Sequence, residues 1–389
     1  MKRILTLIAA AAALVSCSTA PQDRPYYDKA EEMFSTVWNL YRVPEYGLFS
    51  EYYPSSAKPD LDYFDDGVHQ AQEVSFLWPM SGIFSSTVLL AEAEPEKYRP
   101  YLDSMVVSME MYYDTTRVPF AYQAYPTRFD RVDRYYDDNG LVGIDYIDTY
   151  RVTRNPAHLE KAKQIMSFIL SGWDFRYEGG VPWVEGKDDQ KPACSNGKAM
   201  VLALKLYDAT SNDYYLQTGI RLYEWISKWL KDPELNIVWN AWITEGEGHV
   251  QKAPWTYNTG TLLQAAAALY RITGEQKYLD DAQALAKGSA DFFFHYTDDG
   301  IPYTYNIPWF DVVLFRGYQA LYDITGDPTY VDIFIKAVDW AWDHARDGAG
   351  LVCRDWTGLR DETRKPKWLL DSSCVIEFLT RIAIVRKEI

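Results

Sequence analysis

An internal repeat of paired helices constrains the fold of this chain more than any other feature of its sequence. Four copies of the motif Tyr-x-x-Thr, starting at Tyr150, Tyr207, Tyr270 and Tyr322, each lie between two helical patterns. Successive copies are 57, 63 and 52 residues apart, which is enough for two helices and their loops. Three copies follow a glycine by ten residues, at Gly140, Gly197 and Gly260. We therefore expect each unit to start a helix near the glycine, end it at the threonine and return as a second helix.

The two helices of a unit differ in how their apolar residues are distributed. The stretch 262–269 has Gln264 as its only polar residue, which predicts a helix buried on all sides. The returning stretch 159–169 instead has apolar residues on one face and charged residues on the other. Two returning helices begin with Asn155-Pro156 and Asp327-Pro328, an N-cap followed by proline. The pattern predicts an inner and an outer layer.

Weaker helical patterns complete the set. We expect further inner helices at 76–93 and 370–385, and outer helices at 27–41, 97–113, 214–230 and 330–344. Twelve helices in six pairs predict an all-α fold, a closed (α/α)6 toroid with six inner and six outer helices. The alternative is an open helical solenoid. Two long aromatic loops, 44–74 and 114–136, favour the toroid, because long loops in a compact domain often serve function.

The N-terminus has the features of a bacterial export signal. Met1-Lys2-Arg3 precedes an apolar run from 4 to 15, which is shorter than the about 20 residues of a membrane-spanning helix. The run ends in Leu14-Val15-Ser16-Cys17, which resembles a lipobox and predicts lipidation of Cys17; ordinary secretion is the alternative. We expect a signal peptide at 1–17, a tether at 18–25 and one catalytic domain at 26–389.

Lipidation would place the protein in the bacterial cell envelope, attached to the membrane through its lipid. No acidic run follows Cys17, which slightly favours the periplasm over the cell surface. A formal net charge of −16 disfavours nucleic acid as a partner. The sequence has no HExxH, CxxC or EF-hand motif and no nucleotide-binding glycine loop, so we expect no metal and no cofactor. We also expect a monomer, and the sequence leaves open whether Cys353 and Cys374 pair.

One pair of adjacent carboxylates is a candidate for catalysis. In a closed toroid all inner helices begin at one end, so residues at their starts converge on one mouth. Of five Asp-Asp pairs in the chain, only Asp137-Asp138 opens an inner helix. Retaining glycosidases hold two carboxyl groups about 5–5.5 Å apart. We expect this pair on a turn, because adjacent side chains within a helix diverge by about 100°. Capping of the helix is the alternative role.

Other residues near the predicted mouth are candidates for binding a sugar. Asn196, Tyr257 and Asn258 could bond hydroxyl groups or cap helices, and the tryptophans could stack on sugar rings or fill the core. Asp311 is a candidate hydroxyl acceptor, with Arg316 as its expected partner. The complete set of expected substrate-binding residues is Trp78, Tyr136, Asn139, Trp183, Asn196, Trp255, Tyr257, Asn258, Trp309 and Asp311.

An ordered set of short motifs gives the chain a family resemblance. The motifs are YYDDNG at 135–140, GGVPWVEG at 179–186, CSNGKA at 194–199, WTYNTG at 255–260 and LFRG at 314–317. In this order, over roughly 75–385, the chain resembles glycoside hydrolase family 76, the bacterial endo-α-1,6-mannanases and their fungal cell-wall relatives. The family often has tryptophans where this chain has Tyr135 and Tyr136, and a further Trp pair where it has 141–144.

The resemblance implies an (α/α)6 toroid that hydrolyses α-1,6-mannosidic bonds in mannan backbones with retention and without a metal. It implies Asp137 as nucleophile and Asp138 as acid/base. One alternative is a transglycosidase of the same family. Another is a non-catalytic glycan-binding lipoprotein, which would predict loss of a carboxylate, and both are present. A different toroid enzyme is a further alternative, but an epimerase would need paired histidines, and no such pair is evident.

Overall fold

The structure is a computed structural model of the chain, and it describes residues 23–64 and 67–389. The expected signal peptide, Cys17 and most of the tether lie outside the described residues. The pair Asp65-Asp66 lies outside them as well.

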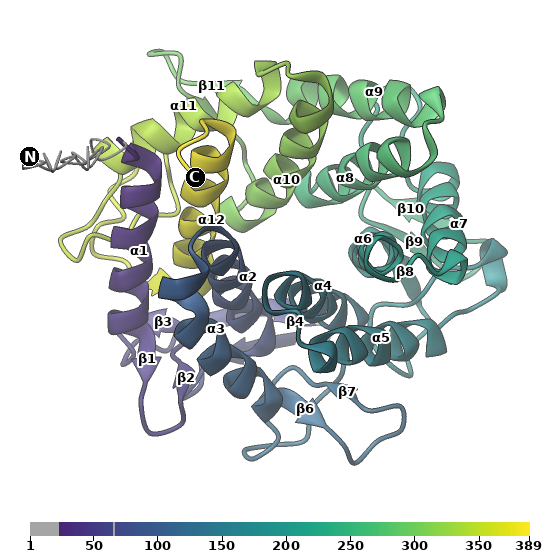
Figure 1. Cartoon of the computed structure of the whole chain (residues 1–389), viewed down its shortest axis with the longest axis horizontal. Coiled ribbons are helices and arrows are strands. Elements are labelled where there is room, and N and C mark those ends of the chain that lie inside the picture. The colour runs from purple at the N-terminus through teal and green to yellow at the C-terminus, as the bar shows by residue number, and fades with distance from the viewer. Residues whose placement is uncertain (1–22, 65–66) are drawn as a thin grey trace, which may run out of the picture.

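Twelve α-helices in the described residues form two concentric layers (Figure 1). Each inner helix contacts the next, and the last contacts the first, so the ring is closed as predicted and the open solenoid is wrong. The inner helices are α2 (Leu77–Ala93), α4 (Tyr136–Thr153), α6 (Ala193–Thr210), α8 (Thr256–Thr273), α10 (Pro308–Thr325) and α12 (Leu369–Val385). The outer helices are α1 (Pro25–Tyr41), α3 (Pro95–Met109), α5 (Pro156–Ser171), α7 (Asp213–Trp229), α9 (Gln276–Phe293) and α11 (Thr329–His344).

The Tyr-x-x-Thr repeat is the end of an inner helix. The residue after each threonine is left-handed and donates its backbone N–H to the tyrosine carbonyl at 2.7–2.8 Å. The threonine hydroxyl then accepts the N–H two residues on, where the outer helix starts. Gly274 and Gly326 take the left-handed position in two copies, but Arg154 and Ser211 occupy it in the others with φ of 55° and 53°. A side chain at such a φ costs roughly 1 kcal/mol.

The glycines near the helix starts allow the inner helices to approach closely. A Cβ added at Gly140 would lie 2.5 Å from the Cβ of Lys198 on α6. One added at Gly260 would lie 2.4 Å from the Cα of Leu314 on α10. These contacts bring α4 close to α6 and α8 close to α10 at this end of the ring.

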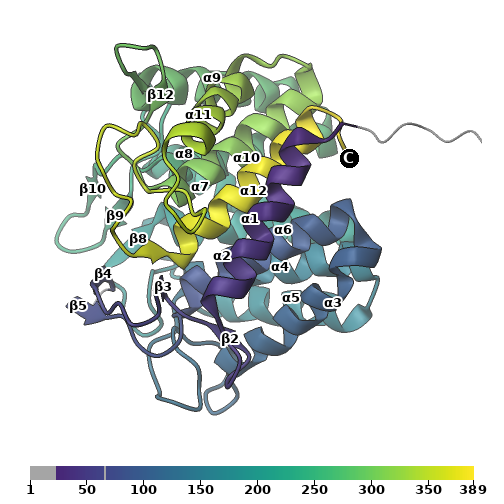
Figure 2. The ribbon, with the colours of Figure 1, turned by 90° about the vertical axis from the view of Figure 1, so that its left-hand side faces the viewer.

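The described residues also form thirteen short strands in the connections between helices. The all-α prediction did not include them. They are β1 (Arg42–Val43), β2 (Leu48–Phe49), β3 (Tyr52–Tyr53), β4 (Asp60–Phe64), β5 (Gly67–Gln70), β6 (Tyr113–Asp114), β7 (Ala121–Tyr122), β8 (Gln190–Pro192), β9 (Ala241–Ile243), β10 (His249–Gln251), β11 (His295–Tyr296), β12 (Pro302–Tyr303) and β13 (Lys367–Trp368). Strands β8, β9 and β10 form one antiparallel sheet, and the others pair in twos. Figure 2 shows β3–β5 and β8–β10 gathered at one end of the bundle.

Two further observations concern the described residues alone. None of their helices has the length and apolar character needed to cross a membrane. Cys194, Cys353 and Cys374 are free thiols, so Cys353 and Cys374 do not form a disulfide.

Candidate active site

A cavity of about 500 Å³ lies at the end of the toroid where the inner helices begin. We call it the central cavity. Every inner helix, or the residue just before it, contributes to its wall. The lining includes Phe76 and Trp78 by α2, Asp137, Asp138 and Leu141 on α4, Cys194 and Lys198 on α6, Trp255 and Tyr257 at α8, Trp309, Phe310 and Val313 on α10, and Trp368 before α12. The two long loops, 44–74 and 114–136, add Asp62, Tyr63, Phe64, Ala124 and Tyr135 to the lining.

Both aspartates of the candidate pair line this cavity, although they do not sit on a turn. Asp137 and Asp138 are the second and third residues of α4, so the expectation of a turn before the helix is wrong. Side chains in the first turn of a helix point outward past its end, where the unpaired N–H groups favour negative charge. The first turn of α4 faces the cavity closely enough for adjacent residues to reach it.

The two carboxyl groups have different surroundings. The Trp183 indole Nε1–H lies 3.1 Å from both Asp137 carboxylate oxygens, and the Cys194 thiol also bonds this carboxylate. In the described part of the chain, no hydrogen bond to the Asp138 carboxyl is found. Hydrogen bonds from donors stabilise the ionised form of a carboxyl group. The arrangement therefore favours charge on Asp137 over charge on Asp138.

The pKa shifts follow the same asymmetry. Burial raises the pKa of Asp137, while the bonds from Cys194 and Trp183 oppose that rise. Burial raises the pKa of Asp138 well above its usual range, and the neighbouring Asp137 charge raises it further. Lys198 supplies a cation in the same cavity, and burial lowers its pKa to about 8. The surroundings thus favour the protonated form of Asp138 over that of Asp137, with the Lys198 amine in the same cavity.

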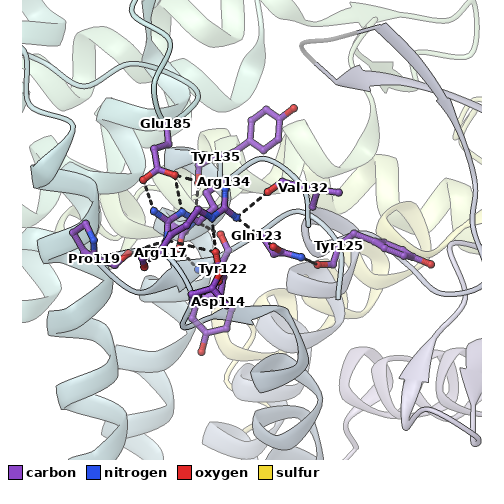
Figure 3. Close-up of polar contacts among 12 residues, drawn as sticks. Asp114, Arg117, Pro119, Tyr122, Gln123, Tyr125, Val132, Arg134, Tyr135 and Glu185 are labelled. Atoms are coloured by element: carbon purple, nitrogen blue, oxygen red, sulfur yellow. Dashed lines mark hydrogen bonds and ion pairs between the residues drawn. The ribbon is translucent and has the colours of Figure 1, made fainter. Parts of the chain in front are cut away.

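An ion pair between the buried Arg134 and the partly exposed Glu185 holds the segment that carries Trp183 (Figure 3). The Arg134 guanidinium, 1% exposed, donates to the Glu185 carboxylate, with Nε 2.7 Å from Oε2. The same guanidinium donates to the Pro119 carbonyl at 2.8 Å. Backbone bonds run alongside, from Tyr136 N–H to the Trp183 carbonyl and from Glu185 N–H to the Arg134 carbonyl. These contacts fix the strand-like segment 183–185 against the start of α4.

A second layer of contacts supports Arg134 from the 114–132 loop. Arg117 pairs with Asp114 and donates to the Val132 carbonyl at 2.9 Å (Figure 3). Gln123 donates to the Tyr125 carbonyl at 2.7 Å. The Thr116 and Arg117 bonds outweigh the effect of burial and hold the pKa of Asp114 at about 2. The loop is therefore anchored before it reaches the aspartates.

Aromatic rings form much of the cavity wall. Trp78 stacks on Phe310 with ring centroids 6.0 Å apart, and Tyr63 stacks on Trp368 at 5.5 Å. Tyr257 packs against Phe310 at 4.4 Å. Five of the residues expected to bind substrate line the cavity: Trp78, Trp183, Trp255, Tyr257 and Trp309. Flat apolar faces with polar edges suit pyranose rings.

Three residues expected to bind substrate have structural roles instead. Tyr136 points away from the cavity and stacks on Phe168 of α5 at 4.9 Å. The amide of Asn139 is buried and pairs with both backbone groups of Tyr122. Asn196 pairs in the same way with Val181. Asn139 and Asn196 occupy equivalent positions in the repeat, directly before Gly140 and Gly197. In both units this amide binds the backbone of the loop that precedes the inner helix.

Thr259, before Gly260, continues this pattern by accepting the Val238 N–H at 2.9 Å. The side-chain amide of Asn258 is buried and has no hydrogen-bond partner in the described residues, and it does not line the central cavity. Asp311 accepts hydrogen bonds from Thr256 and Thr304 and faces a neighbouring cavity. The expected Asp311–Arg316 partnership is wrong, because Arg316 pairs with Glu377 of α12.

Several lining residues were not among the expected ones. Cys194 and Lys198 lie within the CSNGKA motif, and Cys194 stands three residues before Gly197, as Asp137 does before Gly140. That shared position in the repeat was the available signal. The lining residues Tyr63, Trp368 and Arg354 have no comparable signal in the sequence. In the described ranges, no cluster of His, Cys, Asp or Glu side chains has the geometry of a metal site.

Comparisons with known proteins agree with this geometry. The model of glycosyl hydrolase family 76 matches residues 26–320. A family 76 glycoside hydrolase (mannosidase) of Bacteroides thetaiotaomicron is 28% identical, with a TM-score of 0.84 over 93% of this chain and 99% of that one. An inactive variant of an α-1,6-mannanase of Salegentibacter sp. HEL1_6, in complex with α-1,6-mannotriose, shares the fold. Its TM-score is 0.74 at 22% identity, over 92% of this chain and 99% of that one.

Curated relatives match over a shorter stretch. A putative mannan endo-1,6-α-mannosidase of Schizosaccharomyces pombe is 25% identical over 192 residues, which are 46% of this chain and 43% of that protein. The chain thus spans less than half the length of this curated relative.

Proposed function

The chain belongs to glycoside hydrolase family 76, and we propose that it hydrolyses α-1,6-mannosidic bonds within mannan backbones, with retention of configuration. The observation that carries the proposal is the asymmetric pair of carboxyl groups in the central cavity. Asp137 accepts two donors that favour its charge, and Asp138 has neither. The names of the mannosidase and mannanase relatives support mannan as the substrate.

The two carboxyl groups suit a double displacement. The Asp137 carboxylate attacks the anomeric carbon while Asp138 gives its proton to the departing glycosidic oxygen. This leaves a mannosyl ester on Asp137 and a carboxylate on Asp138. Asp138 then takes a proton from water, whose oxygen attacks the anomeric carbon and releases Asp137. The raised pKa of Asp138 keeps its proton available at neutral pH, as the first step requires.

The residues around the pair assist in distinct ways. Trp183 orients the attacking carboxylate through its indole N–H, and Lys198 offsets negative charge in the cavity. The aromatic walls of Trp78, Tyr257 and Phe310 hold sugar rings near the aspartates by apolar contact. The chain's own residues supply both the nucleophile and the acid that this chemistry needs.

The aspartates are tested by Asp137→Asn and Asp138→Asn. Each variant should fold normally by circular dichroism and lose at least a thousandfold in rate on linear α-1,6-mannan, about 4 kcal/mol of barrier. Asp298→Asn is the matched control, because Asp298-Asp299 is an exposed pair in a turn. Near-normal rates in Asp137→Asn or Asp138→Asn would contradict the catalytic role and favour helix capping as the role of the pair.

The stereochemistry of the product is a separate test. Proton NMR should show the α-anomer as the first product, and a β-anomer would exclude the double displacement. Sugar transferred to a glycan acceptor in preference to water would favour the transglycosidase instead.

We also propose that Cys17 is lipidated and attaches the protein to the bacterial envelope. The periplasm is slightly favoured over the cell surface as its location, and we propose that the protein is a monomer. The support is the sequence Leu14-Val15-Ser16-Cys17 after an apolar run. Labelled palmitate should enter the wild-type protein in a bacterial host and not Cys17→Ala. Equal labelling of both proteins would contradict the proposal.

A further inference from the structure

A second cavity of about 340 Å³ adjoins the central one. We call it the side cavity. It lies between the start of α10, the outer helix α11 and the 354–362 loop. Tyr305, Ile307 and Arg354 line both cavities, so the two are neighbours across these three residues. The chemistry at Asp137 and Asp138 does not involve the side cavity.

The lining of the side cavity combines aromatic rings with groups that form hydrogen bonds. Tyr303, Tyr305 and Trp356 provide aromatic surface, while Thr304, Asn306 and Asp311 provide polar atoms. Tyr305 is 77% exposed at the boundary of the two cavities, where its ring is open to a ligand. Apolar surface with a few convergent polar groups is the usual character of a small-molecule site.

The charges of the lining point to a neutral ligand. Arg354 and Arg360 are accompanied by the acidic residues Asp311, Asp355 and Glu362. Arg354 is already paired with Asp371, with Nε 2.7 Å from Oδ2. A phosphate or carboxylate ligand would meet this acidic set, whereas a sugar offers hydroxyl groups to both signs of charge.

The loop that forms the outer wall is held by its own hydrogen bonds. The Asp355 side chain accepts the backbone N–H groups of Thr357 and Arg360 at 3.0 and 2.9 Å. Glu362 accepts the Asp355 N–H at 2.9 Å, and the Trp340 indole donates to the Thr357 carbonyl at 3.0 Å. A wall ordered in this way loses little entropy when a ligand binds.

We propose that the side cavity binds one further hexose unit of the polysaccharide, remote from the glycosidic bond that Asp137 and Asp138 cleave. The inference rests on the proposed function and extends it to substrate recognition. Two parts of a mannan could supply this hexose: a backbone unit that extends beyond the central cavity, or a side branch. Binding there adds the same stabilisation to ground and transition states, so it lowers KM and leaves kcat nearly unchanged.

The test uses Tyr303→Ala, which removes a ring that lines the side cavity alone, and Tyr296→Ala as the matched control. Tyr296 lies on the other strand of the same hairpin, is 59% exposed and lines neither cavity. Kinetics are measured on linear α-1,6-manno-oligosaccharides of increasing length and on branched mannan. We expect Tyr303→Ala to raise KM about two- to tenfold on the substrates that reach the side cavity. Tyr296→Ala should behave as wild type.

The pattern of the effect identifies the source of the hexose. A rise in KM that begins at a certain linear length assigns a backbone unit, and a rise on branched mannan alone assigns a branch. Leu359→Ala, at an exposed rim position, should show a smaller rise of the same pattern and guards against misfolding of the first variant. Equal KM values for the Tyr303 and Tyr296 variants on every substrate would overturn the inference.

Failure of the proposed function would look different. In that case wild-type protein would cleave none of these substrates. The side cavity would then be tested by the affinity of the uncleaved oligosaccharides, where Tyr303→Ala should bind more weakly than Tyr296→Ala. Equal affinities would again overturn the inference.

Discussion

Replacing Trp183 by Phe should move the acid limb of the pH–rate profile to higher pH. The substitution keeps a ring in the cavity wall but removes the indole N–H, which lies 3.1 Å from both Asp137 oxygens. A donor to a carboxylate favours the ionised form and lowers its pKa. Its loss therefore raises the pKa of Asp137, and the nucleophile stays protonated to a higher pH.

The structure also sets the size of this shift. A hydrogen bond to a charged group contributes about 1.5–3 kcal/mol, and 1.36 kcal/mol corresponds to one pKa unit. Here a single N–H is shared between two oxygens, and the carboxyl group is partly open to the cavity, so water can replace some of the contact. The lower end of the range applies, and we expect a shift of about one unit.

The assay is kcat/KM on linear α-1,6-mannan against pH, because its limbs report the pKa values of the free enzyme. Trp255→Phe is the control, since Trp255 also lines the cavity but packs against Phe310. The control should leave the acid limb where it is. An unmoved limb in Trp183→Phe, or a shift to lower pH, would refute the role of the indole N–H.

Three further predictions concern the supports of the site and the fold. Glu185→Ala should lower the free energy of unfolding by about 1–3 kcal/mol in chemical denaturation, because it removes the carboxylate to which the buried Arg134 donates hydrogen bonds, whereas unchanged stability would show the pair to be unimportant. Ser211→Gly should raise stability by about 0.5–1 kcal/mol, since glycine adopts φ of 53° without strain, and a lower melting temperature would contradict that reasoning. Gly140→Ala should destabilise the protein by about 1–3 kcal/mol, because the new Cβ would lie 2.5 Å from the Cβ of Lys198, and a neutral effect would mean that α4 and α6 separate easily.

The helices and their ends could be predicted from the sequence because the interactions that define them are local. The Tyr150 carbonyl accepts the Arg154 N–H and the Thr153 hydroxyl accepts the Asn155 N–H, so each contact spans only two to four residues. The predicted outer helix 214–230 is observed at Asp213–Trp229, and the inner helix 370–385 at Leu369–Val385. The alternation of inner and outer helices, read from apolar periodicity and capping residues, also implied that the inner helices all begin at one end of the ring.

Which polar side chain at a helix start enters the cavity could not be predicted in this way. Asp137, Asp138 and Asn139 are consecutive, yet the first two line the cavity while the third binds the backbone of Tyr122. Successive residues of a helix point about 100° apart, so the outcome depends on the rotation of the helix about its axis. That rotation is set by packing across the ring, as at Gly140 against Lys198.

The sequence by itself therefore determined the helix pairs and the place of the aspartate pair at the start of an inner helix, whereas the contacts between α12 and α2 showed that the ring closes. Only the tertiary structure decided that Trp183 reaches Asp137, that Asn196 anchors a loop and that Arg316 pairs with Glu377. The partners in these contacts lie 46, 15 and 61 residues apart in the chain. Contacts over such separations depend on how helices and loops pack in three dimensions, and no local pattern of residues specifies that.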